Sequence, residues 1–121
     1  MRNLNNINKL IDDYQKKFIS KIDSSSKEKI NKLSKHILNK WENNNTIFII
    51  GNGGSGANAL HIANDFLYGS GIANKKGINV EALVSNSSVI TCLANDVGYD
   101  SIFSEQIKVK AKKNDLLIIL S

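Results

Sequence analysis

The sequence predicts an α/β protein with a parallel sheet, and three observations support this fold class. Amphipathic periodicity over the first 45 residues gives way to short runs that are wholly apolar. Those runs alternate with segments of helical character, in the order strand, helix, strand, helix, strand. A cluster of glycines directly follows the first apolar run. Such alternation is typical of parallel strands that are joined by right-handed helical crossovers.

Two helices are predicted within residues 1–45. Apolar residues recur there with the i, i+3, i+4 spacing of amphipathic helices, at Ile7, Leu10, Ile11, Tyr14, Phe18, Ile19 and Ile22, and then at Ile30, Leu33, Ile37, Leu38 and Trp41. Ser25 and Glu28 have the spacing of a capping box, which predicts that the second helix starts at Ser25. We expect residues 1–45 to form an antiparallel helical hairpin and residues 46–121 to form a separate domain.

Residues 46–121 are predicted to hold three strands and three helices. The strands are expected at 46–50, 78–84 and 115–120, and the helices at 55–68, from a cap within 85–88 to about Asn95, and at 101–110. The runs TIFII and DLLIIL suit strands that are buried on both faces. The first of these helices is closed by Gly69 and Gly71.

The last predicted strand ends one residue before the end of the chain. A parallel sheet needs helices on both faces, and an uncovered edge strand invites association. We therefore expect this chain to be the N-terminal part of a longer protein. The alternative is a partner subunit that covers the open edge.

Composition and charge argue against several classes of partner. The net charge is +5, and the excess lies in residues 1–45, which carry ten Lys and Arg against five Asp and Glu. Because acidic residues are interspersed and no aromatic residues are interleaved as a stacking platform, this pattern is typical of a solvated helix surface and not of a nucleic-acid or membrane-binding face. Cys92 is the only cysteine, so no intrachain disulfide can form. We see no signal peptide or membrane span, and we predict a cytoplasmic protein.

The glycine-rich turn has two interpretations. Residues 51–56 read GNGGSG, which fits the G-x-G-x-x-G dinucleotide fingerprint between a strand and a helix. That fingerprint needs an acidic residue at the end of the second strand, where this chain has Val84, Ser85 and Asn86. In the second interpretation, backbone N–H groups at a helix N-terminus bind a phosphate or sugar oxygen. All three strands end in small polar residues, at 51–55, 85–88 and 121, which suits a hydroxyl-rich ligand.

The helix after the turn carries a histidine and a carboxylate on one face. His61 and Asp65 are four residues apart, with Asn58 and Tyr68 near the same face. Such a pair can ligate one metal ion or act in acid–base catalysis, and the alternative is an ordinary exposed pair. The loop Ala94-Asn95-Asp96-Val97-Gly98-Tyr99 is a third candidate feature, for which ordinary turn chemistry, Asn-Asp followed by Gly, is the alternative.

Three segments in order carry a family resemblance. GNGGSGANALHIANDF, VSNSSVITCLANDVGYDSIFSEQI and DLLIILS together resemble the phosphoheptose isomerases, which are sugar isomerase (SIS) domain proteins. The resemblance spans about residues 47–121 and implies a flavodoxin-like, three-layer SIS fold. It also implies a homotetramer that converts sedoheptulose 7-phosphate to D-glycero-D-manno-heptose 7-phosphate for bacterial cell-surface heptose synthesis. Two alternatives stay open: a SIS module that binds a phosphosugar without turnover, and an NAD-binding Rossmann protein.

The resemblance also implies roles for particular residues. The positions that match substrate-contacting positions of the family are Asn52, Gly53, Gly54, Ser55, Asn95, Asp96 and Ser121. His61 matches a zinc ligand. Asp65 stands where the family usually has Glu, and this position contacts substrate, binds zinc and acts as the catalytic base. Asp is one methylene shorter than Glu, which draws the carboxylate back from the proton it must reach.

Overall fold

The computed structural model describes residues 4–71 and 76–121, with side chains from Asn6 onward. The chain divides into two compact units, Met1–His36 and Ile37–Ser121. The predicted ranges 1–45 and 46–121 include residues 1–3 and 72–75, which lie outside the described residues. Among the helices that the structure describes, none has the length and apolar character needed to cross a membrane.

The first unit contains α1 (Leu4–Ser20) and most of α2 (Ser24–Glu42), which confirms the two predicted helices. The start of α2 differs from the prediction, because Asp23 and not Ser25 caps it. The Asp23 carboxylate accepts a hydrogen bond from the backbone N–H of Ser26 at 2.7 Å. This bond holds the pKa of Asp23 below its ordinary value. An ionised carboxylate is a stronger cap acceptor than a hydroxyl.

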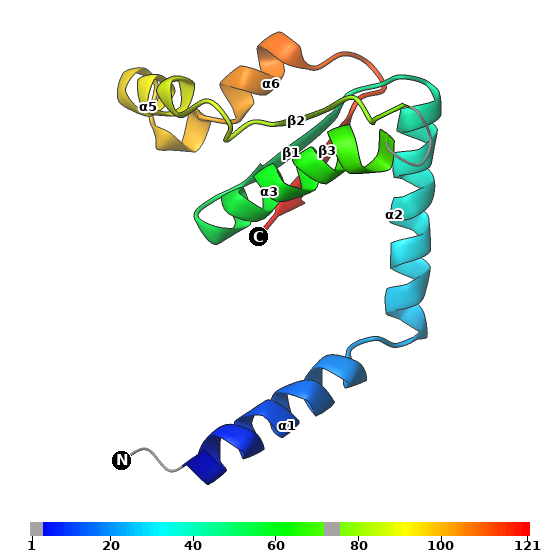
Figure 1. Cartoon of the computed structure of the whole chain (residues 1–121). Helices are drawn as coiled ribbons and strands as arrows, with labels where there is room; N and C mark the ends of the chain where they lie inside the picture. The colour runs from blue at the N-terminus through cyan, green and yellow to red at the C-terminus, as the bar shows by residue number, and fades with distance from the viewer. Residues whose placement is uncertain (1–3, 72–75) are drawn as a thin grey trace. The chain divides into compact units, whose positions relative to one another are not determined.

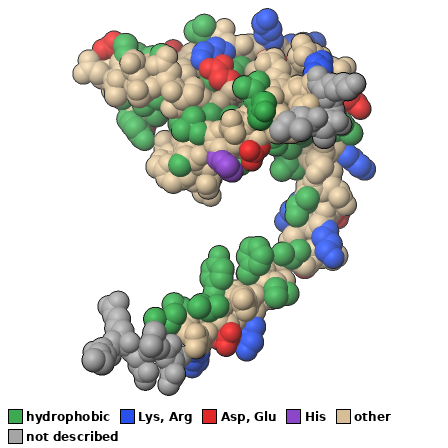
Figure 2. Space-filling model, in the orientation of Figure 1, with side chains coloured by type: hydrophobic (Ala, Val, Ile, Leu, Met, Phe, Trp, Pro, Cys, Tyr) green, Lys and Arg blue, Asp and Glu red, His purple; other side chains and the backbone are tan. Residues whose placement is uncertain are grey.

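The apolar stripe of α1 is exposed within the single chain. Its members are each about half exposed or more, at Ile7, Leu10, Ile11, Tyr14, Phe18 and Ile19. The rings of Tyr14 and Phe18 stack with centroids 6.5 Å apart. Figure 2 shows hydrophobic side chains gathered along this helix. The pairing of α1 with α2 as a hairpin stays a prediction.

The second unit is built on a three-stranded parallel sheet in the order β2-β1-β3 (Figure 1). The strands are β1 (Ile47–Gly51), β2 (Val80–Ala82) and β3 (Leu116–Leu120). Ile47 lies opposite Val80 on one side and Leu116 on the other. The next strands along the chain therefore lie on opposite sides of β1. The carboxyl end of β1 is a switch point of the kind where α/β sheets bind ligands.

The second strand is shorter than the predicted range 78–84. The N–H of Ile78 donates to the carbonyl of Phe66, so this residue is bonded outside the sheet. Beyond β2, the N–H of Ser85 bonds back to the carbonyl of Ala82 and turns the chain away. Only Val80–Ala82 remain as regular strand.

Helices follow β1 and β2 in the predicted order, with two differences. The predicted helix 55–68 is α3 (Gly54–Asn64) followed by a π-helical turn, η1 (Asp65–Gly69). The predicted helix 101–110 is divided into a 3₁₀ turn, η2 (Tyr99–Ser101), and α6 (Ser104–Lys110). The division arises because the N–H groups of Ser101 and Ile102 bond three residues back and close the tighter turn. Helix α5 (Ser87–Asp96) begins within the predicted cap region.

The core lies on the face of the sheet that α3 covers. Its fully buried members come from β1, α3 and the β2 segment: Ile47, Ile49, Ala59, Ile78 and Ala82. Ile37 and Trp41 at the end of α2 pack against this cluster. Burial of several branched side chains at about 1.5–3 kcal/mol each makes this cluster the main stabilising element of the unit.

On the opposite face of the sheet, a buried polar residue of α6 makes hydrogen bonds to neighbouring segments. Phe48 points to this face because successive strand residues alternate. Gln106 of α6 is 4% exposed and donates from Nε2 to the carbonyls of Leu83 at 3.1 Å and Ile102 at 2.9 Å. The bond to Leu83 fastens α6 to the residue after β2, and the bond to Ile102 joins it to the end of η2. Strand β3 lies at one edge of the described sheet, and its residue Ile119 is 65% exposed on a face of that sheet.

Candidate functional site

The turn after β1 needs glycine for two different reasons. A Cβ on Gly51 would lie 2.6 Å from the backbone carbonyl of Ser55, so α3 can start directly against the strand end only if Gly51 has no side chain. Gly53 has φ of 53°, in the region that favours glycine. The carbonyl of Asn52 accepts the N–H groups of Ser55 at 3.0 Å and Gly56 at 3.3 Å, which closes the turn.

The N-terminus of α3 carries no cap from its own side chains. Gly53 is the N-cap residue, and no side chain hydrogen-bonds to this helix end. Within the described residues, the N–H groups of Gly53 and Gly54 donate to no acceptor. A Cβ on either glycine would meet no atom within 4 Å, so the space in front of them is open. Free N–H groups and the helix dipole together favour an anion or a polar oxygen at this position.

Two adjoining hollows run along the carboxyl ends of β1 and β3. They have volumes of about 320 and 410 Å³ and share the lining residues Ser55, Ile119, Leu120 and Ser121. The first reaches Asn52, and the second reaches Asn58 and His61. The structure therefore brings together four of the predicted site residues, Asn52, Ser55, His61 and Ser121.

His61 and Asp65 face each other on α3 and the start of η1. His61 Nε2 lies 3.5 Å from Asp65 Oδ2, with the two side chains 78% and 58% exposed. The helix changes from α to π geometry at Asp65, and π turns occur frequently at functional sites. In the part of the chain that the structure describes, no group of three or more His, Cys, Asp or Glu side chains is placed to hold a metal ion. The pair supplies at most two ligands.

Asn95 and Asp96 lie at the end of α5 and line neither of the two hollows. Asn95 Nδ2 donates to Asp96 Oδ1 at 2.8 Å, and the Cys92 thiol donates to Asp96 Oδ2 at 3.4 Å. The bond from Asn95, followed by that from Cys92, holds the pKa of Asp96 below its ordinary value. The bond to Asp96 and its negative charge raise the pKa of Cys92. A substrate-contacting role for Asn95 and Asp96 stays a prediction.

Tyr99 contacts the candidate site; the sequence placed it in the candidate loop 94–99 but gave it no role of its own. Its hydroxyl donates to Asn52 Oδ1 at 3.1 Å and so links η2 to the glycine turn. A third hollow of about 420 Å³ lies on this side of the turn, lined by Asn52, Gly53, Tyr99 and mainly apolar side chains. The glycine directly before Tyr99 was the available signal, because it allows the backbone to turn after α5.

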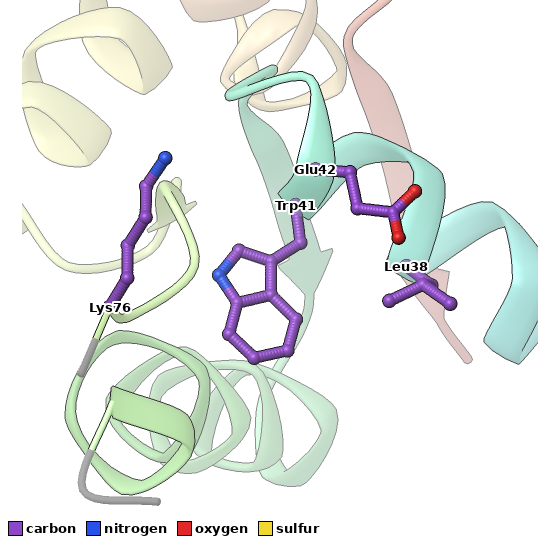
Figure 3. A pocket seen from close by; sticks show the side chains of 4 residues that line it. All are labelled: Leu38, Trp41, Glu42 and Lys76. Atoms are coloured by element: carbon purple, nitrogen blue, oxygen red, sulfur yellow. The ribbon is translucent and has the colours of Figure 1, made fainter. Parts of the chain in front are cut away.

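A separate cavity of about 350 Å³ contains none of the predicted site residues. It is lined by Leu38, Trp41, Glu42 and Lys76 (Figure 3). Trp41 also packs against the core, so its indole has a structural role. This cavity does not compete with the glycine turn as the candidate site.

The fold and the site define the class of the protein. The family model described as SIS domain matches residues 12–121, and the chain belongs to the SIS domain family. This membership favours the phosphosugar interpretation of the glycine turn over the dinucleotide one. Consistent with it, no acidic residue follows β2 before Asn86.

The particular proteins that this chain resembles are phosphoheptose isomerases. It is 38% identical over 103 residues to the phosphoheptose isomerase of Aliarcobacter butzleri. This alignment covers 85% of this chain and 54% of the relative. It is 35% identical over 119 residues to that of Helicobacter pylori strain P12, covering 93% and 62%. The chain thus spans between half and two thirds of these relatives' length. The resemblance drawn from the three sequence segments is confirmed.

Solved structures agree with the family assignment. Phosphoheptose isomerase GmhA from Neisseria gonorrhoeae has a TM-score of 0.67 and 27% sequence identity, over 93% of this chain and 60% of that one. A phosphoheptose isomerase from Francisella tularensis has a TM-score of 0.87 over 100% of this chain and 62% of that one. At 23% identity, the second comparison shows the shared fold alone. The predicted SIS fold is confirmed.

Proposed function

We propose that the protein is an aldose–ketose isomerase that converts sedoheptulose 7-phosphate into D-glycero-D-manno-heptose 7-phosphate. The observation that carries this proposal is the uncapped N-terminus of α3 at the end of the central strand, with a histidine–carboxylate pair further along the same helix. The relatives named phosphoheptose isomerase support the choice of reaction.

Polar groups along the strand ends are suited to hold a phosphorylated sugar. The free N–H groups of Gly53 and Gly54 would donate to sugar or phosphate oxygens. Asn52, Ser55 and Ser121 line the adjoining hollow and add side-chain hydrogen bonds. Asn95 and Asp96 would contact substrate from the end of α5, as the family resemblance implies.

Asp65 would move the proton that defines the reaction. In a ketose-to-aldose conversion, a base removes a proton from C1 and the electron pair moves to the C2 carbonyl oxygen, which gives an enediolate. The proton then returns at C2, while the C1 hydroxyl gives up its proton to the oxygen on C2 and becomes the aldehyde carbonyl. A carboxylate within hydrogen-bond reach, about 3 Å, can carry the proton between the two carbons. Donors at the helix N-terminus stabilise the enediolate oxygen.

His61 and Asp65 would also serve as two ligands of a zinc ion. Two ligands that each lie about 2.1 Å from a tetrahedral zinc ion are about 3.4 Å apart. The observed separation of 3.5 Å between Nε2 and Oδ2 fits this spacing. When bound, zinc supplies a Lewis acid that polarises a substrate oxygen. Metal analysis that finds no zinc in the purified protein would contradict this part, as would zinc retained unchanged in His61→Ala.

The proposal also includes the oligomeric state and the location. The protein would form a homotetramer in the cytoplasm and would serve heptose synthesis for the cell surface. The exposed apolar stripe of α1, with Leu10 69% and Tyr14 70% exposed, supports association between copies. A phosphorylated sugar substrate and a single free cysteine both suit the cytoplasm. Light scattering measures the oligomeric state directly.

The test of the proposed reaction is conversion of sedoheptulose 7-phosphate by the purified protein and by its Asp65→Asn variant. The amide keeps the size of the side chain but cannot take the proton, so we expect turnover to fall about 10²- to 10⁴-fold. Asp12→Asn on α1 is the matched control and should leave turnover unchanged. Undiminished turnover in Asp65→Asn would remove Asp65 as the base. Binding of the sugar phosphate with no conversion by the parent would instead identify a non-catalytic module.

A further inference from the structure

We propose that Tyr99 is a positioning residue that orients the carboxamide of Asn52, so that Asn52 meets the ligand as a hydrogen-bond donor. This inference rests on the proposed function for its kinetic test. The two residues are 47 positions apart in the sequence and are joined by one hydrogen bond between side chains.

The hydrogen bond decides which end of the carboxamide is available. Tyr99 donates its hydroxyl proton to Asn52 Oδ1 at 3.1 Å, so the amide oxygen is already engaged. Among the residues that the structure describes, none accepts a hydrogen bond from Asn52 Nδ2. A carboxamide has nearly the same shape in both orientations, and a neighbouring donor or acceptor must choose between them. Here the donor of Tyr99 leaves the NH₂ group for the ligand.

The position of Asn52 makes this choice important. Asn52 lines the hollow that runs to Ser121 and also the hollow that contains Tyr99. It follows β1 directly and precedes the free N–H groups of Gly53 and Gly54. With Nδ2 as a further donor, three N–H donor groups lie next to one another at this turn, those of Asn52, Gly53 and Gly54. Such a set favours an oxygen that accepts hydrogen bonds, and most strongly one that carries negative charge.

Tyr99 is 57% exposed and lies in a turn that backbone hydrogen bonds close. Gly98 has φ of 101°, which allows the chain to leave α5 and enter η2. The carbonyls of Gly98 and Tyr99 accept the N–H groups of Ser101 at 3.0 Å and Ile102 at 3.3 Å. Ile102 is 3% exposed and anchors this turn in the protein. Tyr99 therefore reaches Asn52 from a hydrogen-bonded turn that is anchored by a buried side chain.

The kinetic test compares Tyr99→Phe with the parent, using sedoheptulose 7-phosphate as substrate. The substitution removes only the hydroxyl, so Asn52 loses its fixed orientation and the ring stays in place. We expect KM to rise about two- to tenfold, the range for loss of one neutral hydrogen bond, with kcat within about twofold. In an Asn52→Ala background, Tyr99→Phe should cause no further loss, since the group that it orients is absent. Thermal stability should not change.

Tyr14→Phe is the matched control. Tyr14 stacks on Phe18, and within the described part of the chain its hydroxyl has no hydrogen-bond partner. This variant should keep the parent's KM. An unchanged KM in Tyr99→Phe would overturn the inference. The inference would also be overturned if the double variant's rise in KM equalled the combined rises of Tyr99→Phe and Asn52→Ala alone.

A readout without turnover separates this inference from the proposed reaction. The side-chain NH₂ resonances of Asn52, assigned by comparison with Asn52→Ala in ¹⁵N–¹H spectra, should move in Tyr99→Phe and not in Tyr14→Phe. If they move while the parent shows no isomerisation, the positioning role stands and the proposed reaction fails. If isomerisation is normal while neither the resonances nor KM changes, the positioning role fails.

Discussion

Helices α3 and α5 both start at the carboxyl edge of the same sheet, but their N-termini are finished differently. At α5, Asn86 Oδ1 accepts the N–H of Val89 at 3.1 Å and caps the helix from within the chain. At α3, the N-cap residue is Gly53, which has no side chain to do this. The N-terminus of α5 is therefore capped by a side chain of the protein, whereas the N-terminus of α3 keeps free N–H groups.

This difference teaches which of the two ends is built for a ligand. A helix end without a cap costs stability unless another group satisfies its N–H donors. Substituting an Asn cap by Gly costs only a few tenths of a kcal/mol, so the loss at α3 is small. In return, the backbone at the end of β1 can be approached closely by a sugar or phosphate oxygen.

The largest expected effect is the fall in the free energy of unfolding in Gly51→Ala, which displaces the N-terminus of α3. The new Cβ would lie 2.6 Å from the Ser55 carbonyl carbon, so the helix must move away from the end of β1. We expect a loss of about 3 kcal/mol in the free energy of unfolding, measured by urea denaturation. Gly54→Ala is the control and should change stability little, because its Cβ would meet no atom within 4 Å. Equal stability of Gly51→Ala and the parent would contradict the packing described for the turn.

A smaller effect is expected at the capped helix. Asn86→Ala removes the bond to the Val89 N–H and should lower the free energy of unfolding by about 1 kcal/mol. Ser88→Ala, two residues further along α5, should change it little. Neither substitution should alter the affinity for sedoheptulose 7-phosphate, because neither residue lines the two hollows along the ends of β1 and β3. Weaker binding by Asn86→Ala at unchanged stability would reverse the roles assigned to the two helix ends.

The smallest expected effect concerns the thiol at the other end of α5. The hydrogen bond from Cys92 to Asp96, together with the carboxylate charge, raises the pKa of Cys92. Less thiolate is present at a given pH, so alkylation by iodoacetamide should begin to rise only at a higher pH than for an ordinary exposed cysteine. In Asp96→Asn this rise should shift to lower pH and alkylation at neutral pH should be faster. Asp100→Asn should behave like the parent, and identical pH profiles for all three would contradict the Cys92–Asp96 contact.

Much of this arrangement could be predicted from the sequence. Short apolar runs, the glycine cluster and the i, i+4 spacing of His61 and Asp65 are local patterns, and they gave the order of elements and the central position of the turn. Two features could not be read from local patterns. The sequence predicted a cap at Ser25, whereas Asp23 caps the helix, and only the path of the chain decides which side chain reaches the N–H. The contact between Tyr99 and Asn52 depends on how η2 lies over the end of β1.

The most direct test of the central claim is a calorimetric titration of the purified protein with sedoheptulose 7-phosphate. The comparison is between Asn52→Ala at the uncapped turn and Asn86→Ala at the capped helix, each with its folding checked by circular dichroism. The account predicts that Asn52→Ala weakens binding about tenfold or more, because a donor to the ligand is lost, while Asn86→Ala binds like the parent. Parent-like binding by a folded Asn52→Ala variant would contradict the claim that the glycine turn after β1 is the ligand site.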